Sequence, residues 1–396
     1  MDINLIYKLD YASMGRIFGK KFVKKNKNNI ELIINGNKSN LTDCCDLKEG
    51  ENKVQLIIKN ELTDLSDMFN ECEDLINIEG LKNLNVSNVT NFNSMFSECK
   101  KLTDIKPLEK WNVKNCTDFS DMFRNCESLS DIKPIEKWNV QNCKDFSGMF
   151  DSCTSLTDIK PLEKWNVKNC TDFSGMFAEC KSLKDIKPLE NWNVSNVTKI
   201  KNMFSGCTSL TDIKPLEKWN VQNCNDFSFL FHGCEKLSNI KALENWNVSN
   251  GKNLNAMFNF CESLSDIKPL EKWNVKNCNK FSRMFGDNKS LVDIKPLENW
   301  NVENGTDFSG MFDGCEKIND IGHLKNWNVE KGKDLSVMFN KCRLVKDVKP
   351  LKKWKVNKKA NVQLMFNLCG ESVDLKDLES WGLEKGIEAF WIDDLF

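Results

Sequence analysis

The feature that most constrains this chain is a Met-Phe dipeptide that returns every 27 residues without insertion or deletion. It runs from Met68-Phe69 to Met365-Phe366, and Leu230 replaces methionine in the only variant. A unit this short cannot bury an apolar face alone, so it must stack on its neighbours. The sequence therefore predicts a repeat solenoid of about twelve coils.

One repeat, which begins at Ser120, predicts how each coil is built. Ser120 is placed to cap a short helical turn that points Phe123 and Cys126 inward. Leu129 and Ile132 follow in an apolar pattern typical of the strand of such a stack. A proline ends that strand, and all eight prolines of the chain occupy this one repeat position. We expect a mainly β coil with short helical turns.

Eleven of the twelve tryptophans also keep one repeat position, and an asparagine follows most of them. Stacked rings can form an accessible platform for sugars or single-stranded nucleic acid. The alternation of Trp138 with Val140 instead favours an inward ring, beside an Asn139 that hydrogen-bonds the backbone of the neighbouring coil. The predicted structural core rows are represented by Phe123, Cys126, Leu129, Ile132, Trp138 and Asn139.

The repeat divides the chain into three parts. Residues 1–60 do not follow it, and they predict a small β-rich cap with strands at 4–9, 30–34 and 53–58. Residues 61–381 form the solenoid, and residues 382–396 lose the repeat and are expected to fold over the last coil. Both covers are needed, because an open end exposes apolar side chains and unpaired backbone groups.

Composition predicts a cytoplasmic protein, with the cell surface as the alternative. The net charge of -1 comes from 56 basic and 57 acidic residues, so bulk charge indicates neither a nucleic-acid nor a membrane partner. The amino terminus lacks the continuous apolar core of a signal peptide, and no apolar stretch has the length of a transmembrane segment. We expect a monomer whose 18 cysteines are buried free thiols, since zinc spacings are absent.

No pattern in the chain predicts catalysis. The only histidines, His232 and His323, fall at unrelated repeat positions and are not expected to meet. The nucleotide-binding and nucleophile-elbow motifs are absent, and the carboxylates lie in solvated rows without a pocket to tune them. We therefore expect no catalytic, cofactor-binding or metal residues, no cofactor and no enzymatic activity.

The repeat resembles the BspA-like leucine-rich repeats, in the variant found in mycoplasma surface lipoproteins and expanded in protists. The resemblance rests on the string M-F-x-x-C-x-S-L-x-D-I-K-P-L-E-x-W-N-V and covers about residues 62–381. Residues 16–29 look like the cap segment of the protist members. The resemblance implies a right-handed leucine-rich-repeat-like stack without catalytic activity, used for protein contact or surface adhesion. From the amino-terminal residues we expect no lipoprotein leader of the kind that the bacterial members carry.

Function is therefore sought in rows of charge. In most repeats an Asp and a Lys flank the inward Ile, and a Glu follows the proline, which predicts either a solvated surface or a striped docking face. Towards the carboxyl terminus the rows break and the sequence turns basic. The candidate interaction surface comprises Asp212, Lys214, Asp266, Lys268, Asp293, Lys295, His323, Lys325, Lys349, Lys352, Lys353 and Lys355.

The leading prediction is a non-catalytic protein–protein interaction scaffold with a partner of unknown identity. In this hypothesis the basic carboxyl-terminal coils contact an acidic protein surface, and no nucleic acid is expected. The alternative is a surface adhesin or extracellular binding protein exported without a classical leader. A weaker alternative is binding of an anionic polymer or membrane by the basic segments 16–27 and 341–359.

Overall fold

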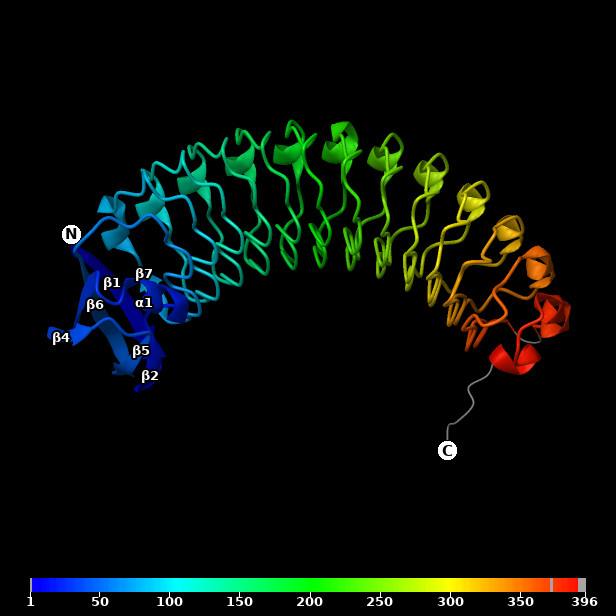
Figure 1. Cartoon of the computed structure of the whole chain (residues 1–396), viewed down its shortest axis with the longest axis horizontal. Coiled ribbons are helices and arrows are strands. Elements are labelled where there is room, and N and C mark those ends of the chain that lie inside the picture. Colours follow the sequence, from blue (N-terminus) through cyan, green and yellow to red (C-terminus); the bar gives the residue numbers. More distant parts are fainter. Residues whose placement is uncertain (1, 371–372, 391–396) are drawn as a thin grey trace. The chain divides into compact units, whose positions relative to one another are not determined.

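The computed structural model describes residues 2–370 and 373–390, and the chain divides into two compact units after Asn196. The first unit holds an amino-terminal β region and the first coils, and the second holds the remaining coils. In each unit the coils stack side by side with short 3-10 turns along one edge and the Met-Phe turns along the opposite edge (Figure 1). The chain is a repeat solenoid, as the sequence predicted.

The amino-terminal region is a five-stranded antiparallel sheet beside a two-stranded one. The larger sheet has the order β4-β3-β6-β1-β7, and the smaller pairs β2 with β5. The three predicted strands are present, and two of them begin earlier than expected. The strands are β1 Asp2–Leu9, β2 Ser13–Arg16, β3 Ile30–Ile34, β4 Asn37–Asn40, β5 Cys44–Leu47, β6 Gly50–Ile58 and β7 Leu75–Asn77.

The helix α1, Lys20–Asn26, joins this region to the first coil. Just before it, the backbone N–H of Gly19 donates to the carbonyl of Met68 at 3.1 Å. A Cβ atom at position 19 would lie 2.0 Å from the carbonyl oxygen of Asp67, so only glycine allows this approach. Lys21 pairs with Asp67 at 3.3 Å and Lys25 with Asp64 at 2.7 Å. Part of the basic segment 16–27 thus forms ion pairs with the first coil of the same chain.

Each coil contains a 3-10 turn rather than the predicted strand. The segment from Leu129 to Ile132 has no ladder partner, and a turn follows it at η3, Lys133–Ile135. The physical reason is that Pro134 lacks an N–H, while the Asp131 carboxylate accepts the N–H of Lys133 at 2.8 Å. Among the described residues, the first coil alone forms a strand here, β7, because β1 lies beside it.

The remaining 3-10 turns repeat this position along both units, except η13, which belongs to the carboxyl-terminal segment. In the first unit they are η1 Glu79–Asn83, η2 Lys106–Leu108, η4 Lys160–Leu162 and η5 Lys187–Leu189. In the second unit they are η6 Lys214–Lys218, η7 Lys241–Leu243, η8 Lys268–Leu270, η9 Lys295–Leu297, η10 Gly322–Leu324, η11 Lys349–Lys353, η12 Leu375–Trp381 and η13 Gly386–Phe390.

The coils are joined at the Met-Phe edge by a one-way ladder of backbone hydrogen bonds. Phe119, Asp121 and Phe123 donate their N–H groups to carbonyls of the following coil at 3.0, 2.7 and 2.9 Å. Asp121 and Asn125 have φ of 53° and 55°, so left-handed residues alternate with others along the ladder. Ser120 therefore does not cap a helical turn, and that prediction was wrong. Every second N–H group along this segment therefore points towards the following coil.

The interior rows are filled as predicted, with one exception. Phe123, Cys126 and Trp138 are buried, and phenyl rings of successive coils stack, as Phe123 does on Phe150 at 5.8 Å. Asn139 is the exception, because it is exposed and accepts the N–H of Gln141 at 3.3 Å within its own coil. The bond to the neighbouring coil comes instead from Asn142, whose side chain donates to the carbonyl of Lys114 at 2.8 Å.

The carboxyl-terminal segment covers the last coil as far as it is described. Phe390 packs on Phe366 and Trp381, with ring centroids 5.7 and 5.8 Å away. Its carbonyl accepts the N–H of Leu364 at 2.9 Å. Residues 391–396, which belong to the predicted cap 382–396, lie outside the described residues.

Candidate interaction surface

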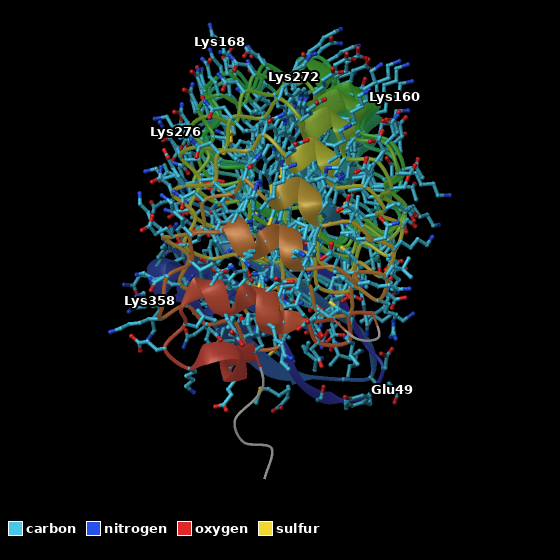
Figure 2. All side chains as sticks on the ribbon, turned by 90° about the vertical axis from the view of Figure 1, so that its right-hand side faces the viewer. Glu49, Lys160, Lys168, Lys272, Lys276 and Lys358 are labelled. Carbon is cyan, nitrogen blue, oxygen red and sulfur yellow. The ribbon has the colours of Figure 1, made fainter. Side chains whose placement is uncertain are left out.

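The predicted surface residues lie along the 3-10 turns of the second unit, in and around η6 and η8 to η11. We call these twelve residues, from Asp212 to Lys355, the charged edge. Within one turn the members are neighbours, as Asp266 and Lys268 are, and members of different turns lie one or more coils apart. Figure 2 shows Lys272, which follows η8, extending away from the ribbon. Charged side chains thus form the outer fringe of these coils.

The aspartates of the charged edge stabilise the 3-10 turns by accepting backbone hydrogen bonds. Asp212, Asp266 and Asp293 each accept the N–H of the lysine two residues later, at 2.8, 2.7 and 2.8 Å. Such a bond satisfies a backbone donor at the start of the turn and holds the turn in shape. The recurrence of aspartate is therefore explained by local folding, before any partner is considered.

The lysines of the charged edge have no such role. Lys214, Lys268 and Lys295 are exposed, and in the described part of the chain no carboxylate lies within 4.0 Å of their ammonium groups. The opposite charges of the rows balance one another only at longer range. Because these cations are not engaged within the chain, they are free to meet an external anion.

Adjacent turns leave shallow grooves between them. One groove of about 540 Å³ lies between η7 and η8 and is lined by Lys241, Glu244, Asp266, Lys268 and Pro269, among others. Two similar grooves lie between turns η2, η3 and η4 of the first unit. Each groove offers both charge signs and a proline ring, which suits protein side chains better than a single small ion.

The turn η10 departs from the pattern, since His323 takes the place of proline. The imidazole Nε2 lies 3.4 Å from the carboxylate of Asp320, which also accepts the N–H of Gly322 at 2.7 Å. Lys325 follows and is exposed. His232, the other histidine, lies on the Met-Phe edge of the same unit, so the structure does not bring the two imidazoles together.

The basic members at η11 lie beside acidic residues of the carboxyl-terminal segment. Lys352 is 3.9 Å from Asp377, and Lys359, outside the predicted set, is 3.9 Å from Glu384. Both lysines keep more than half of their side-chain surface exposed, so these contacts are weak surface pairs. Lys349, Lys353 and Lys355 are exposed as well.

The sequence did not single out the Met-Phe edge, where the residues change from coil to coil. In the second unit this edge exposes Phe229 and Phe260, whose side chains are 41% exposed. In other repeats the same two positions hold mostly glycine or polar residues, with Ala256, Val337, Leu364 and Leu368 as the apolar exceptions. That substitution of phenylalanine for glycine within a strict repeat was the signal that could have identified them.

The cysteines and carboxylates form no metal centre in the part of the chain that the structure describes. No group of three or more His, Cys, Asp or Glu side chains there is arranged to hold a metal ion. The cysteines are free thiols, and burial raises the pKa of Cys126, Cys153 and Cys261 in one row. Among the described residues, no helix combines the length and apolar character that crossing a membrane requires.

Comparison with known families shows where the repeat belongs. The profile described as "Mycoplasma protein of unknown function, DUF285" matches residues 43–159, 128–240, 155–268, 210–320 and 262–381. These overlapping matches span most of the chain. The chain belongs to this family. Comparisons with curated proteins and with solved structures found no match. The DUF285 matches cover all the coils that carry the charged edge, so this surface is built on the family's repeat.

Proposed function

We propose that this chain is a non-catalytic protein-binding scaffold whose partner contacts the charged edge. The observation that supports this function is that different residues of the 3-10 turns have different roles, some in holding the turn and others exposed to solvent. At η6, η8 and η9 an aspartate and a proline hold the turn in shape, while Lys214, Lys268 and Lys295 extend from it with no carboxylate of the described residues within 4.0 Å. A rigid array of unengaged charge favours recognition of a partner with complementary charge.

The basic coil at η11 is the proposed centre of that contact. Lys352, Lys353 and Lys355 extend the charged edge with three exposed cations, and their partner would present an acidic protein surface. The carboxylates Asp377 and Glu384 beside this coil are themselves acidic groups facing its lysines, which supports the chemistry of the contact. The resemblance to BspA-like leucine-rich repeats supports a role in protein contact rather than catalysis.

We place this scaffold in the cytoplasm as a monomer that offers its charged edge to one partner. A cell-surface adhesin is the second candidate, and the lipoprotein members of the resembling repeats favour it. Protease shaving of intact cells separates the two, because only a surface protein would be cleaved. Catalysis is not proposed, since the titratable groups of the charged edge are exposed rather than enclosed in a pocket.

Charge reversal tests the proposed contact. The variant Lys352→Glu/Lys353→Glu/Lys355→Glu should lose the partner that the unaltered chain captures from its native cells, because the cations that attract it become anions. The matched control is Lys236→Glu/Lys252→Glu/Lys317→Glu, which makes the same charge change at exposed lysines of the same unit. The measurement is quantitative mass spectrometry of captured proteins. An identical set of captured proteins for both variants would contradict the proposal.

A further inference from the structure

The Met-Phe edge of the second unit carries an aromatic patch formed by Phe229, His232 and Phe260. The imidazole of His232 meets Phe229 at a centroid distance of 5.6 Å and Phe260 at 5.7 Å, with interplanar angles of 74° and 83°. These are edge-to-face contacts, which fix the three rings relative to one another. The phenyl rings remain 41% exposed, so the patch offers a preformed apolar surface to solvent.

Both phenylalanines occupy backbone positions that suit glycine. Phe229 has φ of 57° and Phe260 of 59°, a left-handed conformation that costs free energy in a bulky L-residue. Glycines with positive φ take the same two repeat positions elsewhere, at Gly148, Gly175 and Gly310 for the first and Gly206, Gly233 and Gly314 for the second. The repeat folds with no side chain at either position, so coil formation does not require these rings.

The two coils beside Phe260 differ in the residue they present next to it. Phe260 donates its N–H to the carbonyl of Gly286 at 2.9 Å, and Gly233 donates to the carbonyl of Asn259 at 2.8 Å. The position equivalent to Phe260 is Gly233 in the preceding coil and Asp287 in the following coil. Because Gly233 has no side chain, an external side chain can approach the ring from the preceding coil.

Positive charge surrounds the rings. Lys199 and Lys201 lie one coil before Phe229, and Lys280 and Arg283 lie one coil after Phe260; all four are exposed. Three carboxylates interrupt the positive charge, and one of them, Asp313, pairs with Arg283 at 3.3 Å. Asp226 accepts the hydroxyl of Ser228 at 2.6 Å, and Asp287 is half-buried, which raises the pKa of its carboxyl. The surroundings of the patch are therefore cationic, but not in a continuous track.

We propose that the aromatic patch binds an extended acidic segment of a partner protein, with one apolar or aromatic side chain seated against Phe229 and Phe260. Carboxylates on either side of that anchor would face Lys201 and Lys280, since Arg283 is already paired with Asp313. An apolar anchor within a charged rim is the usual anatomy of a protein-binding hot spot. The carboxylates of Asp226 and Asp287 disfavour a nucleic-acid backbone, which needs an uninterrupted line of cations. This inference does not rest on the charged edge, which lies along the opposite side of the coils.

The test measures binding of defined probes to the full chain by fluorescence anisotropy. The probes are three labelled twelve-residue peptides with Phe, Trp or Leu centred among glutamates, a polyglutamate of the same length, and a twelve-nucleotide oligothymidine. The variant is Phe229→Gly/Phe260→Gly. Its matched control is Val337→Gly/Leu368→Gly, which removes apolar residues with positive φ from the same two repeat positions in other coils.

At least one anchored peptide should bind about tenfold more tightly than polyglutamate, and Phe229→Gly/Phe260→Gly should weaken that binding about tenfold. The control variant should bind as the unaltered chain does. The thermal midpoint of Phe229→Gly/Phe260→Gly should not fall, because glycine relieves the left-handed backbone. Equal binding of anchored peptides and polyglutamate would overturn the proposal, as would unaltered binding in the variant. Tighter binding of oligothymidine that the variant loses would assign the patch to nucleic acid. A lowered midpoint together with lost binding would make the rings structural.

Discussion

At the scale of single residues, two side-chain types recur because each bonds to the preceding coil. The indole N–H of Trp138 donates to the carbonyl of Leu108 at 3.1 Å, and the thiol of Cys126 donates to the carbonyl of Phe96 at 3.2 Å. Burial raises the pKa of the Cys126 thiol, so it keeps the proton that makes this bond. Cysteine is therefore more than a small apolar filler at this position.

The one asparagine in the thiol row should weaken its coil. Asn288 is fully buried, and neither its amide nitrogen nor its oxygen has a hydrogen-bond partner. Asn288→Cys should restore a thiol donor towards Phe258 and raise the free energy of unfolding by about 1–3 kcal/mol, the cost of leaving a buried polar group unsatisfied. Urea unfolding measures the change. The reverse substitution Cys261→Asn serves as control and should destabilise; a stabilising Cys261→Asn would refute the explanation.

Asp121 should make stability depend on pH. Burial, and then repulsion from Asp151 and Asp145, raise the pKa of its carboxyl, although Arg124 opposes the shift. A raised carboxyl pKa means that ionisation destabilises the fold above the folded-state pKa, and that this penalty vanishes below the unfolded-state value of about 3.9. Asp121→Asn should therefore raise the thermal midpoint at pH 7, with a gain that shrinks as pH falls. A gain independent of pH would show that charge is not its cause.

At the scale of the element, the 3-10 turn is built by an aspartate and a proline acting together. The carboxylate of Asp131 binds the N–H of Lys133, and Pro134 fixes the next φ without needing a partner for an N–H of its own. The turn buries Ile135 and leads the chain back to Trp138. One exposed polar residue thus decides the shape of a segment whose apolar pattern alone is ambiguous.

Removing that aspartate should destabilise the turn. Asp131→Ala leaves the N–H of Lys133 without its acceptor, and we expect a loss of about 0.5–1.5 kcal/mol in the free energy of unfolding. The neighbouring Lys133→Ala removes an exposed side chain and should change it by less than about 0.5 kcal/mol. Urea unfolding of the two variants, measured side by side, checks the difference. Equal losses would mean that the bond to Asp131 contributes nothing.

Comparison of elements shows which features the sequence determines. The 27-residue period identified the buried rows, because stacking makes every coil bury the same positions. The strand expected from Leu129 to Ile132 was wrong, since that spacing fits an extended segment entering a turn equally well. The positive φ of ladder residues such as Asp121 could not be predicted, because many different residue types occupy these positions. Asn139 was misplaced because the sequence does not distinguish a bond within a coil from one between coils.

At the scale of the whole molecule, interactions reach mainly from one coil to the next. The coils bond to partners about 27 residues away in either direction, as the bridges Asp118↔Asp145 and Asp307↔Asp334 illustrate within the two units. Stability in such an array is close to a sum of coil and interface contributions. Substitutions at Asn288 and Asp131 should thus act locally. The location of the binding surface was less predictable than the stack. Which charged side chains are exposed, and which form ion pairs within the chain, depends on side-chain geometry.

The one-way ladder gives each stack a chemical polarity. Along this ladder the N–H groups donate towards the following coil, so at this edge the first coil presents carbonyls and the last presents N–H groups. The segments that cover the two ends have complementary groups. At the first coil, the N–H of Gly19 and the ammonium group of Lys21 act as hydrogen-bond donors. At the last coil, the carbonyl of Phe390 accepts the N–H of Leu364. The two covers are therefore not interchangeable. Inserting whole repeats would lengthen the stack and keep the hydrogen bonds of this ladder, whereas reversing a block of repeats would not.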